Sequence, residues 1–201
     1  MAYRMWDATG TEVSLTNTED KQWWIKFGTA GEGNFLTMCR EKGILEGLAD
    51  NPAREKGPKY LPEFTYAGHL LDLKGQGTPF FSSSRYGIPA RYAVTLNARD
   101  VVDVKDKYPD CDIVFWINWV AVKYQQSNSP SIAVDPLHGV WRITPATMFP
   151  LVAEAKEHGR LHQYQRRYQG GPNAPESYVL DVRQMENLWL DPANKPLEAI
   201  R

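Results

Sequence analysis

Three ionisable residues, Glu63, Asp72 and Lys74, flank a short reversal of the chain. The run from Tyr60 to Gln76 alternates in polarity around Ala67-Gly68. This pattern predicts a β-hairpin, because glycine supplies the positive φ that a two-residue turn requires. In that register Glu63 faces Asp72, and the alternation of side chains places Lys74 on the same face. Like charges in opposed positions on a sheet are unfavourable, by roughly 0.2–1 kcal/mol. A divalent cation between the two carboxylates would turn this repulsion into coordination, so the hairpin is a candidate metal site.

A simpler interpretation is an amphipathic hairpin whose polar face is merely solvated. In both interpretations the opposite face points to the core and carries Phe64, Tyr66, Leu71 and Leu73. The paired acids favour the metal site, because a solvated face gains nothing from them.

The residues Pro62-Glu63 followed by Asp72-Leu73-Lys74 resemble the PD-(D/E)xK signature of the restriction-endonuclease-like nuclease superfamily. The resemblance implies a Mg²⁺-dependent (or Mn²⁺-dependent) deoxyribonuclease. Glu63, Asp72 and the carbonyl of Leu73 would hold the cation, and Lys74 would orient the attacking water. Gln76 is similar to the polar residue that often follows the lysine. The chain departs from the pattern at Glu63, where the family usually has Asp. The longer side chain either reaches a displaced ion or is not a ligand.

The order of the expected elements also resembles this superfamily. We expect a short strand at Gln22 to Phe27 and a helix from Gly31 to about Leu48. The hairpin comes next, then a strand at Arg91 to Leu96. A helix capped by Asn97 follows and ends before Pro109. A strand from Asp112 to Val122, buried on both faces, completes an αβββαβ core. The fold class is therefore α/β (α+β), with a central mixed sheet flanked by helices and a C-terminal extension.

Three regions follow from this order: 1–30 as an arm and strand, 31–122 as the nuclease core, and 123–201 as an extension packed on the same domain. Within the extension we expect a strand from Gly139 to Ile143, a helix from Thr144-Pro145 to Gly159, and a strand from Tyr178 to Val182. His158 and His162 stand four apart, but a surface pair is favoured over a zinc site because no HExxH pattern or cysteine partner accompanies them.

Glu32 lies on the same predicted helical stripe as Phe35 and Leu36. One explanation is a favourable acid in the first turn of a helix. The other comes from the resemblance, in which a glutamate of the opening helix supports the metal or its water. Both explanations remain open from the sequence.

The chain has 201 residues, 42% of them hydrophobic and 23% charged, with a net charge of −1. This composition suits a single globular domain and gives no overall basic field. A nuclease of this balance needs locally concentrated positive charge. The candidates for contact with DNA are Arg54, Lys56, Lys59, Arg85, Arg91, Arg166 and Arg167. The alternative for such residues is ordinary solvation of loops and helix ends.

Two cysteines, Cys39 and Cys111, are too few for a disulfide framework. No signal-peptide pattern and no apolar run of about 18 residues is found, so we expect a cytoplasmic protein without membrane contact.

The leading hypothesis is a metal-dependent DNA endonuclease of restriction, phage or homing type, acting on duplex DNA. A homodimer is left open. The alternatives are a catalytically silent nucleic-acid-binding protein with the nuclease fold, and an unrelated α/β interaction protein.

Overall fold

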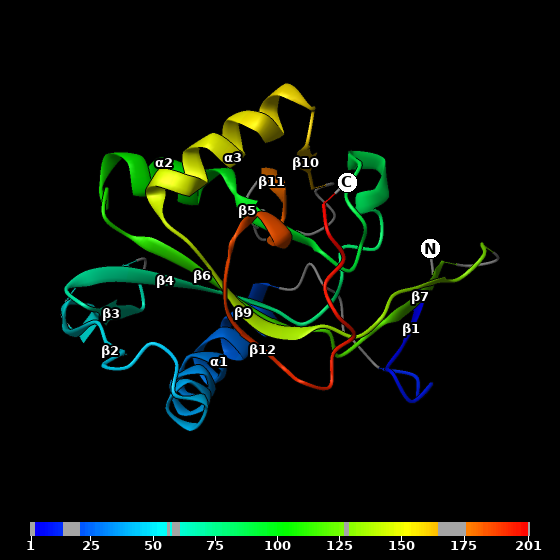
Figure 1. Cartoon of the computed structure of the whole chain (residues 1–201), viewed down its shortest axis with the longest axis horizontal. Coiled ribbons are helices and arrows are strands. Elements are labelled where there is room, and N and C mark those ends of the chain that lie inside the picture. Colours follow the sequence, from blue (N-terminus) through cyan, green and yellow to red (C-terminus); the bar gives the residue numbers. More distant parts are fainter. Residues whose placement is uncertain are drawn as a thin grey trace.

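The computed structural model describes residues 3–13, 21–55, 57, 61–126, 129–164 and 176–200, with only the backbone of residue 3 and residues 21–30. Its centre is a six-stranded sheet in the order β12-β9-β6-β4-β3-β2 (Figure 1). The strands are β2 (Ala49–Asp50), β3 (Phe64–Tyr66), β4 (His69–Gln76), β6 (Asp112–Asn118), β9 (His138–Ile143) and β12 (Glu186–Leu190). Strands β4 and β6 pair in parallel, and the other neighbours pair antiparallel. The protein is therefore mixed α/β with a mixed central sheet, as predicted.

Helices cover both faces of this sheet. Helix α1 (Lys21–Lys42) lies on one side, and α2 (Ala98–Asp106) and α3 (Pro145–Glu157) lie on the other (Figure 1). Successive residues of β6 alternate between the two cores: Val114 packs with the α1 cluster, whereas Ile113 and Phe115 join the α2–α3 cluster. The prediction of a strand buried on both faces is confirmed, because helices on each side remove both sets of side chains from water. Its predicted end is wrong, since β6 ends at Asn118 and not at Val122.

Two smaller sheets flank the centre. One has the order β1-β7-β8 and extends from the body (Figure 1). Its strands are β1 (Tyr3–Trp6), β7 (Lys123–Gln126) and β8 (Ile132–Ala133). The other has the order β10-β11-β5. Its strands are β5 (Ala93–Asn97), β10 (Leu161–Gln163) and β11 (Glu176–Asp181). Short 3₁₀ turns lie at Pro52–Glu55, Ser83–Tyr86 and Val182–Gln184.

The hairpin has the predicted register. Phe64 pairs with Leu71, Thr65 with Leu70 and Tyr66 with His69. The turn residues Ala67 and Gly68 have φ values of 50° and 85°, which is the left-handed pair that a type I′ hairpin turn needs. The turn therefore fixes which residues of β4 face which core.

The prediction at the first helix is wrong in two respects. Gln22 to Phe27 is not a strand, since α1 begins at Lys21, and the helix ends at Lys42 rather than near Leu48. Strand propensity mostly reports side-chain packing and is a weak guide to backbone conformation. At the other end, Gly43 has a φ of 63°, and a left-handed residue stops a helix.

The third strand of the predicted core is also misplaced. The strand expected at Arg91 to Leu96 exists as β5, but it pairs with β11 in a separate sheet. The strand next to β3 is instead β2, which pairs with β3 in an antiparallel manner. Two strands from the C-terminal part, β9 and β12, extend the central sheet beyond β6.

The remaining helices agree with the sequence. Asn97 stands at the N-cap of α2, although its side chain accepts a hydrogen bond from Ser177 instead of capping the helix. Thr144 and Pro145 begin α3, which ends at Glu157. Proline at the first helical position lacks only an N–H that has no intrahelical partner there.

Candidate functional site

The two acids of the hairpin meet in the structure. Glu63 lies immediately before β3, and its Oε2 accepts a hydrogen bond of 2.9 Å from the backbone N–H of Leu73. Buried Asn51 holds this corner: its backbone N–H donates to the carbonyl of Glu63 and its Nδ2 to that of Pro62, both at 2.9 Å. The carboxylate of Glu63 is thereby fixed against β4, between the positions of Asp72 and Lys74.

Lys74 lies between two carboxylates. Its Nζ is 2.6 Å from Oδ2 of Asp72 and 2.9 Å from Oδ2 of Asp100, and the three side chains are between 18% and 23% exposed. Asp72 and Lys74 pair with Ile113 and Phe115 of β6, and these belong to the core on the α2 side. Their side chains therefore share the face that α2 covers.

Asp100 was missed by the sequence reasoning. It stands in the first turn of α2, where an acid is ordinarily explained by the helix dipole. The usable signal was the combination of an acid in the first turn with a helix that must cover the polar face of β4. Without the packing of α2, nothing in the sequence separates Asp100 from Asp103.

The electrostatics of this cluster are those of crowded acids. Burial, followed by the negative charge of Asp72 and a side-chain hydrogen bond with it, raises the pKa of Glu63 to about 8. Burial also raises the pKa of Asp100, although Lys74 opposes that change. For Lys74, burial lowers the pKa, but Asp72 and Asp100 outweigh it and the net shift is upward. The site thus places three carboxyl groups around one ammonium, and Asp72 and Asp100 favour the charged form of that ammonium.

Glu32 belongs to the edge of the same cluster. Its carboxylate binds the guanidinium of Arg54 through both oxygens, at 2.9 and 3.4 Å. Burial lowers the pKa of Arg54, but Glu32, then Glu63 and Asp72, reverse that effect, so this guanidinium lies in the field of all three acids. Because α1 begins at Lys21, Glu32 is not in a first turn, and the explanation by the helix dipole is wrong.

Gln76 follows Lys74 on the same face of β4. Its Nε2 donates to the carbonyl of Thr95 at 3.1 Å, which connects the end of β4 to β5. The side chain of Gln76, two residues after Lys74, therefore links the central sheet to the smaller sheet that contains β5.

The basic residues proposed for DNA contact fall in different places. Arg54 lies at the acid cluster. Arg85 is exposed, with its Nη2 2.8 Å from Nδ1 of His162 and its guanidinium 4.8 Å from the ring centre of Tyr86. Arg91 is 7% exposed and donates to the hydroxyl of Tyr92 and to backbone carbonyls in the C-terminal segment. Lys56, Lys59, Arg166 and Arg167 lie outside the described residues.

The histidines at 158 and 162 have different neighbours. Nδ1 of His158 lies 2.9 Å from the carbonyl of Glu154, whereas Nδ1 of His162 contacts Arg85 and Tyr86. The structure does not bring a carboxylate or thiolate to them among the contacts it describes.

Two carboxylates at the hairpin, those of Glu63 and Asp72, are the candidate protein ligands for a cation. No group of three or more His, Cys, Asp or Glu side chains in the described ranges is arranged to hold a metal ion. Glu63 and Asp72 are a pair, and Mg²⁺ is commonly bound by one or two carboxylates together with waters and substrate phosphates. Burial and the charge of Asp72 raise the pKa of Glu63, and a cation bound by both carboxylates would favour the ionised form of Glu63.

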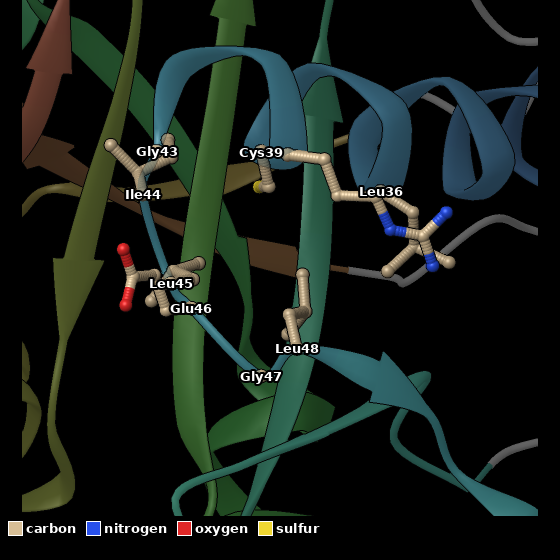
Figure 2. Close-up of a pocket in the computed structure, with 9 residues that line it drawn as sticks. Leu36, Cys39, Gly43, Ile44, Leu45, Glu46, Gly47 and Leu48 are labelled. Atoms are coloured by element: carbon tan, nitrogen blue, oxygen red, sulfur yellow. The ribbon is translucent and has the colours of Figure 1, made fainter.

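A separate cavity of about 360 Å³ lies beneath the C-terminal end of α1 (Figure 2). Its lining comes from α1 and from the segment that follows Gly43, chiefly Leu36, Cys39, Ile44, Leu45 and Leu48. Cys39 is 2% exposed, and burial raises the pKa of its thiol to about 12. None of the candidate site residues lines this cavity.

No protein-family model, curated protein or solved structure matches this chain. Among the helices of the described residues, none is long and apolar enough to cross a membrane.

Proposed function

We propose that this protein is a Mg²⁺-dependent DNA endonuclease of the PD-(D/E)xK type, with its active site at Glu63, Asp72 and Lys74. The observation that carries the proposal is the meeting of two acids and a lysine on one face of the hairpin. The Oε2 atom of Glu63 binds the N–H of Leu73, and the Nζ atom of Lys74 lies 2.6 Å from Asp72.

The arrangement of the elements supports the proposal. In chain order the structure has α1, three antiparallel strands (β2, β3, β4), α2, and β6 parallel to β4. This is an αβββαβ order, although β2 replaces the strand expected from the sequence and β5 lies between β4 and α2 in a different sheet. The two acids lie at the centre of this set.

A bound Mg²⁺ would supply Lewis-acid stabilisation of the scissile phosphate and a water of lowered pKa, with Glu63 and Asp72 as its protein ligands. The ammonium of Lys74 is positioned to stabilise negative charge that develops on a phosphate oxygen or an attacking water. Arg54, at the edge of the site, would contact a phosphate of the DNA backbone. Glu32 holds that guanidinium in place and, in this role, is a positioning residue rather than a ligand.

The test is plasmid cleavage with Mg²⁺ or Mn²⁺ against EDTA. Wild type is expected to convert supercoiled plasmid only with the metal. Lys74→Ala should abolish cleavage, with circular dichroism to establish that the variant is folded, and Lys105→Ala, which replaces an exposed lysine of α2, serves as its control. Asp72→Asn should also be inactive, with Asp110→Asn, an exposed acid outside the cluster, as the control. Cleavage by Lys74→Ala at the wild-type rate would refute the scheme.

A catalytically silent nucleic-acid-binding protein is the second candidate. It is favoured by the pairing of Lys74 with two carboxylates and of Glu32 with Arg54, since these ion pairs can stabilise the fold without any chemistry. In that case the wild type would shift duplex DNA in a gel and leave the plasmid intact with either metal.

A further inference from the structure

The ammonium of Lys74 has two carboxylate partners from different elements. Asp72 is two residues away on the same face of β4, whereas Asp100 reaches over from the first turn of α2. All three side chains are largely buried, so water screens these ion pairs less than it would at the surface.

In the proposed function, the ammonium of Lys74 and a divalent cation compete for the carboxylate of Asp72. Asp72 is already neutralised by Lys74, at 2.6 Å. A divalent cation bound by the same carboxylate would repel the ammonium, because two positive charges would share one acid. The ammonium can remain at the site only if another carboxylate holds it, and Asp100 lies 2.9 Å from its Nζ atom.

We infer that Asp100 is a positioning residue for Lys74: it holds the ammonium at the site while Asp72 binds the divalent cation. This inference rests on the proposed function. It adds a residue of α2, outside the hairpin, to the site. It also explains how Lys74 stays beside Asp72 when Asp72 binds a cation.

The dipole of α2 does not account for this arrangement. An acid in a first turn is stabilised while it points to solvent, and it needs no contact with the sheet. Asp103, on the same helix, shows the ordinary behaviour: its carboxylate pairs with Arg99 and Lys107, each four residues away on α2. Asp103 is therefore a matched control for a change of charge on this helix.

The experiment is a titration with Mn²⁺ by isothermal calorimetry in the absence of DNA. Asp100→Asn should weaken Mn²⁺ binding on the order of tenfold, the size of one charge-assisted contact, because Lys74 then pairs with Asp72 alone. Asp103→Asn should stay within about twofold of wild type, since the carboxylate of Asp103 pairs with Arg99 and Lys107 on α2 and not with Lys74. Asp100→Glu, which keeps the carboxylate, should recover most of the affinity, and it also serves if Asp100→Asn fails to fold.

A double-mutant cycle separates positioning from a simple effect of charge. In the Lys74→Met background, Asp100→Asn should change Mn²⁺ affinity by less than about threefold, because no ammonium remains to be held. An equal loss in both backgrounds would overturn the inference, since Asp100 would then act through its own charge. Equal affinities for wild type and Asp100→Asn would overturn it too and leave the endonuclease intact. A wild type that neither binds Mn²⁺ nor cleaves DNA would overturn both proposals.

Discussion

The carboxylate of Glu63 accepts a hydrogen bond from the backbone N–H of Leu73, at 2.9 Å. This contact attaches the first acid of the hairpin to the strand that carries the second acid and the lysine. Because Leu73 stands between Asp72 and Lys74, the three ionisable groups keep their relative positions as long as β3 and β4 remain paired.

Glu63 should make the metal-free protein less stable as pH rises. Its pKa is about 8 in the folded chain, because of burial and the charge of Asp72, against an ordinary value of 4.5. The folded state therefore holds a proton that the unfolded state releases between about pH 4.5 and 8, and the free energy of unfolding falls through that window. The expected loss is on the order of a few kcal/mol. Urea unfolding at pH 5, 6.5 and 8 in EDTA measures it.

Glu63→Gln should flatten this pH dependence, leaving the smaller contributions of other buried acids such as Asp100. Addition of Mg²⁺ should stabilise the wild type more at pH 8 than at pH 5, since protons and the cation compete for the same carboxylate. A Glu63→Gln variant with the full wild-type slope would show that the titrating group lies elsewhere.

The ion pair of Glu32 and Arg54 should contribute only modestly to the free energy of unfolding. Their ion pair is partly exposed, with side-chain exposures of 25% and 30%, so the coupling energy in a double-mutant cycle of Glu32→Gln and Arg54→Gln should be about 1 kcal/mol or less. Arg54→Gln should weaken binding of duplex DNA, and the effect should shrink as salt rises. Arg4→Gln is the control, because Arg4 also pairs with a glutamate, Glu12, but on β1. Equal DNA affinity of the two variants would contradict a phosphate contact by Arg54.

A substitution in the hairpin turn should reduce cleavage, although the turn residues are not part of the site. Gly68→Ala places a side chain at a φ of 85° and should cost about 1 kcal/mol or more in the free energy of unfolding. Because the register of β3 and β4 brings Glu63 to Asp72, cleavage should fall by more than the stability loss explains. Gly75→Ala is the matched control on the same hairpin, since its φ is ordinary and a Cβ there meets open space. Thermal unfolding and plasmid cleavage are measured together, and equal losses for the two variants would count against control by the turn.

Substitutions at Arg85 and Arg91 should have different effects on the free energy of unfolding. Arg91 is buried, and its guanidinium donates to the carbonyls of Lys195 and Pro196, so Arg91→Met should destabilise the fold by about 1–3 kcal/mol through unsatisfied acceptors. Arg85 is exposed, so Arg85→Met should leave stability within about 0.5 kcal/mol and affect only DNA binding. Urea unfolding and a gel shift distinguish them, and equal stability of the two variants would show that the C-terminal segment does not depend on Arg91.

Local rules were sufficient where the chain decides its structure over a few residues. Ala67-Gly68 fixed the hairpin register, because the left-handed pair allows one tight turn and every side chain then takes a defined face. Pro145 marked a helix start correctly for the same reason, since the missing N–H of proline acts within a single turn. Asn97 also marked the start of α2, although its side chain makes no capping hydrogen bond. The prediction of a strand at Gln22 to Phe27 was wrong, because strand propensity is a weak guide to backbone conformation.

The sequence by itself determined the pairing of the hairpin, the face shared by Asp72 and Lys74, and the alternation that lets β6 be buried on both sides. Only the tertiary structure decided that β2 and not β5 completes the antiparallel strands, that Arg54 pairs with Glu32, and that Asp100 approaches Lys74. The physical reason is distance along the chain. Turns and strand periodicity act between residues that are close in the chain. The ion pairs Arg54–Glu32 and Lys74–Asp100 join residues at least 22 positions apart. They form only once burial of the two hydrophobic cores has placed α1 and α2 on opposite faces of the sheet.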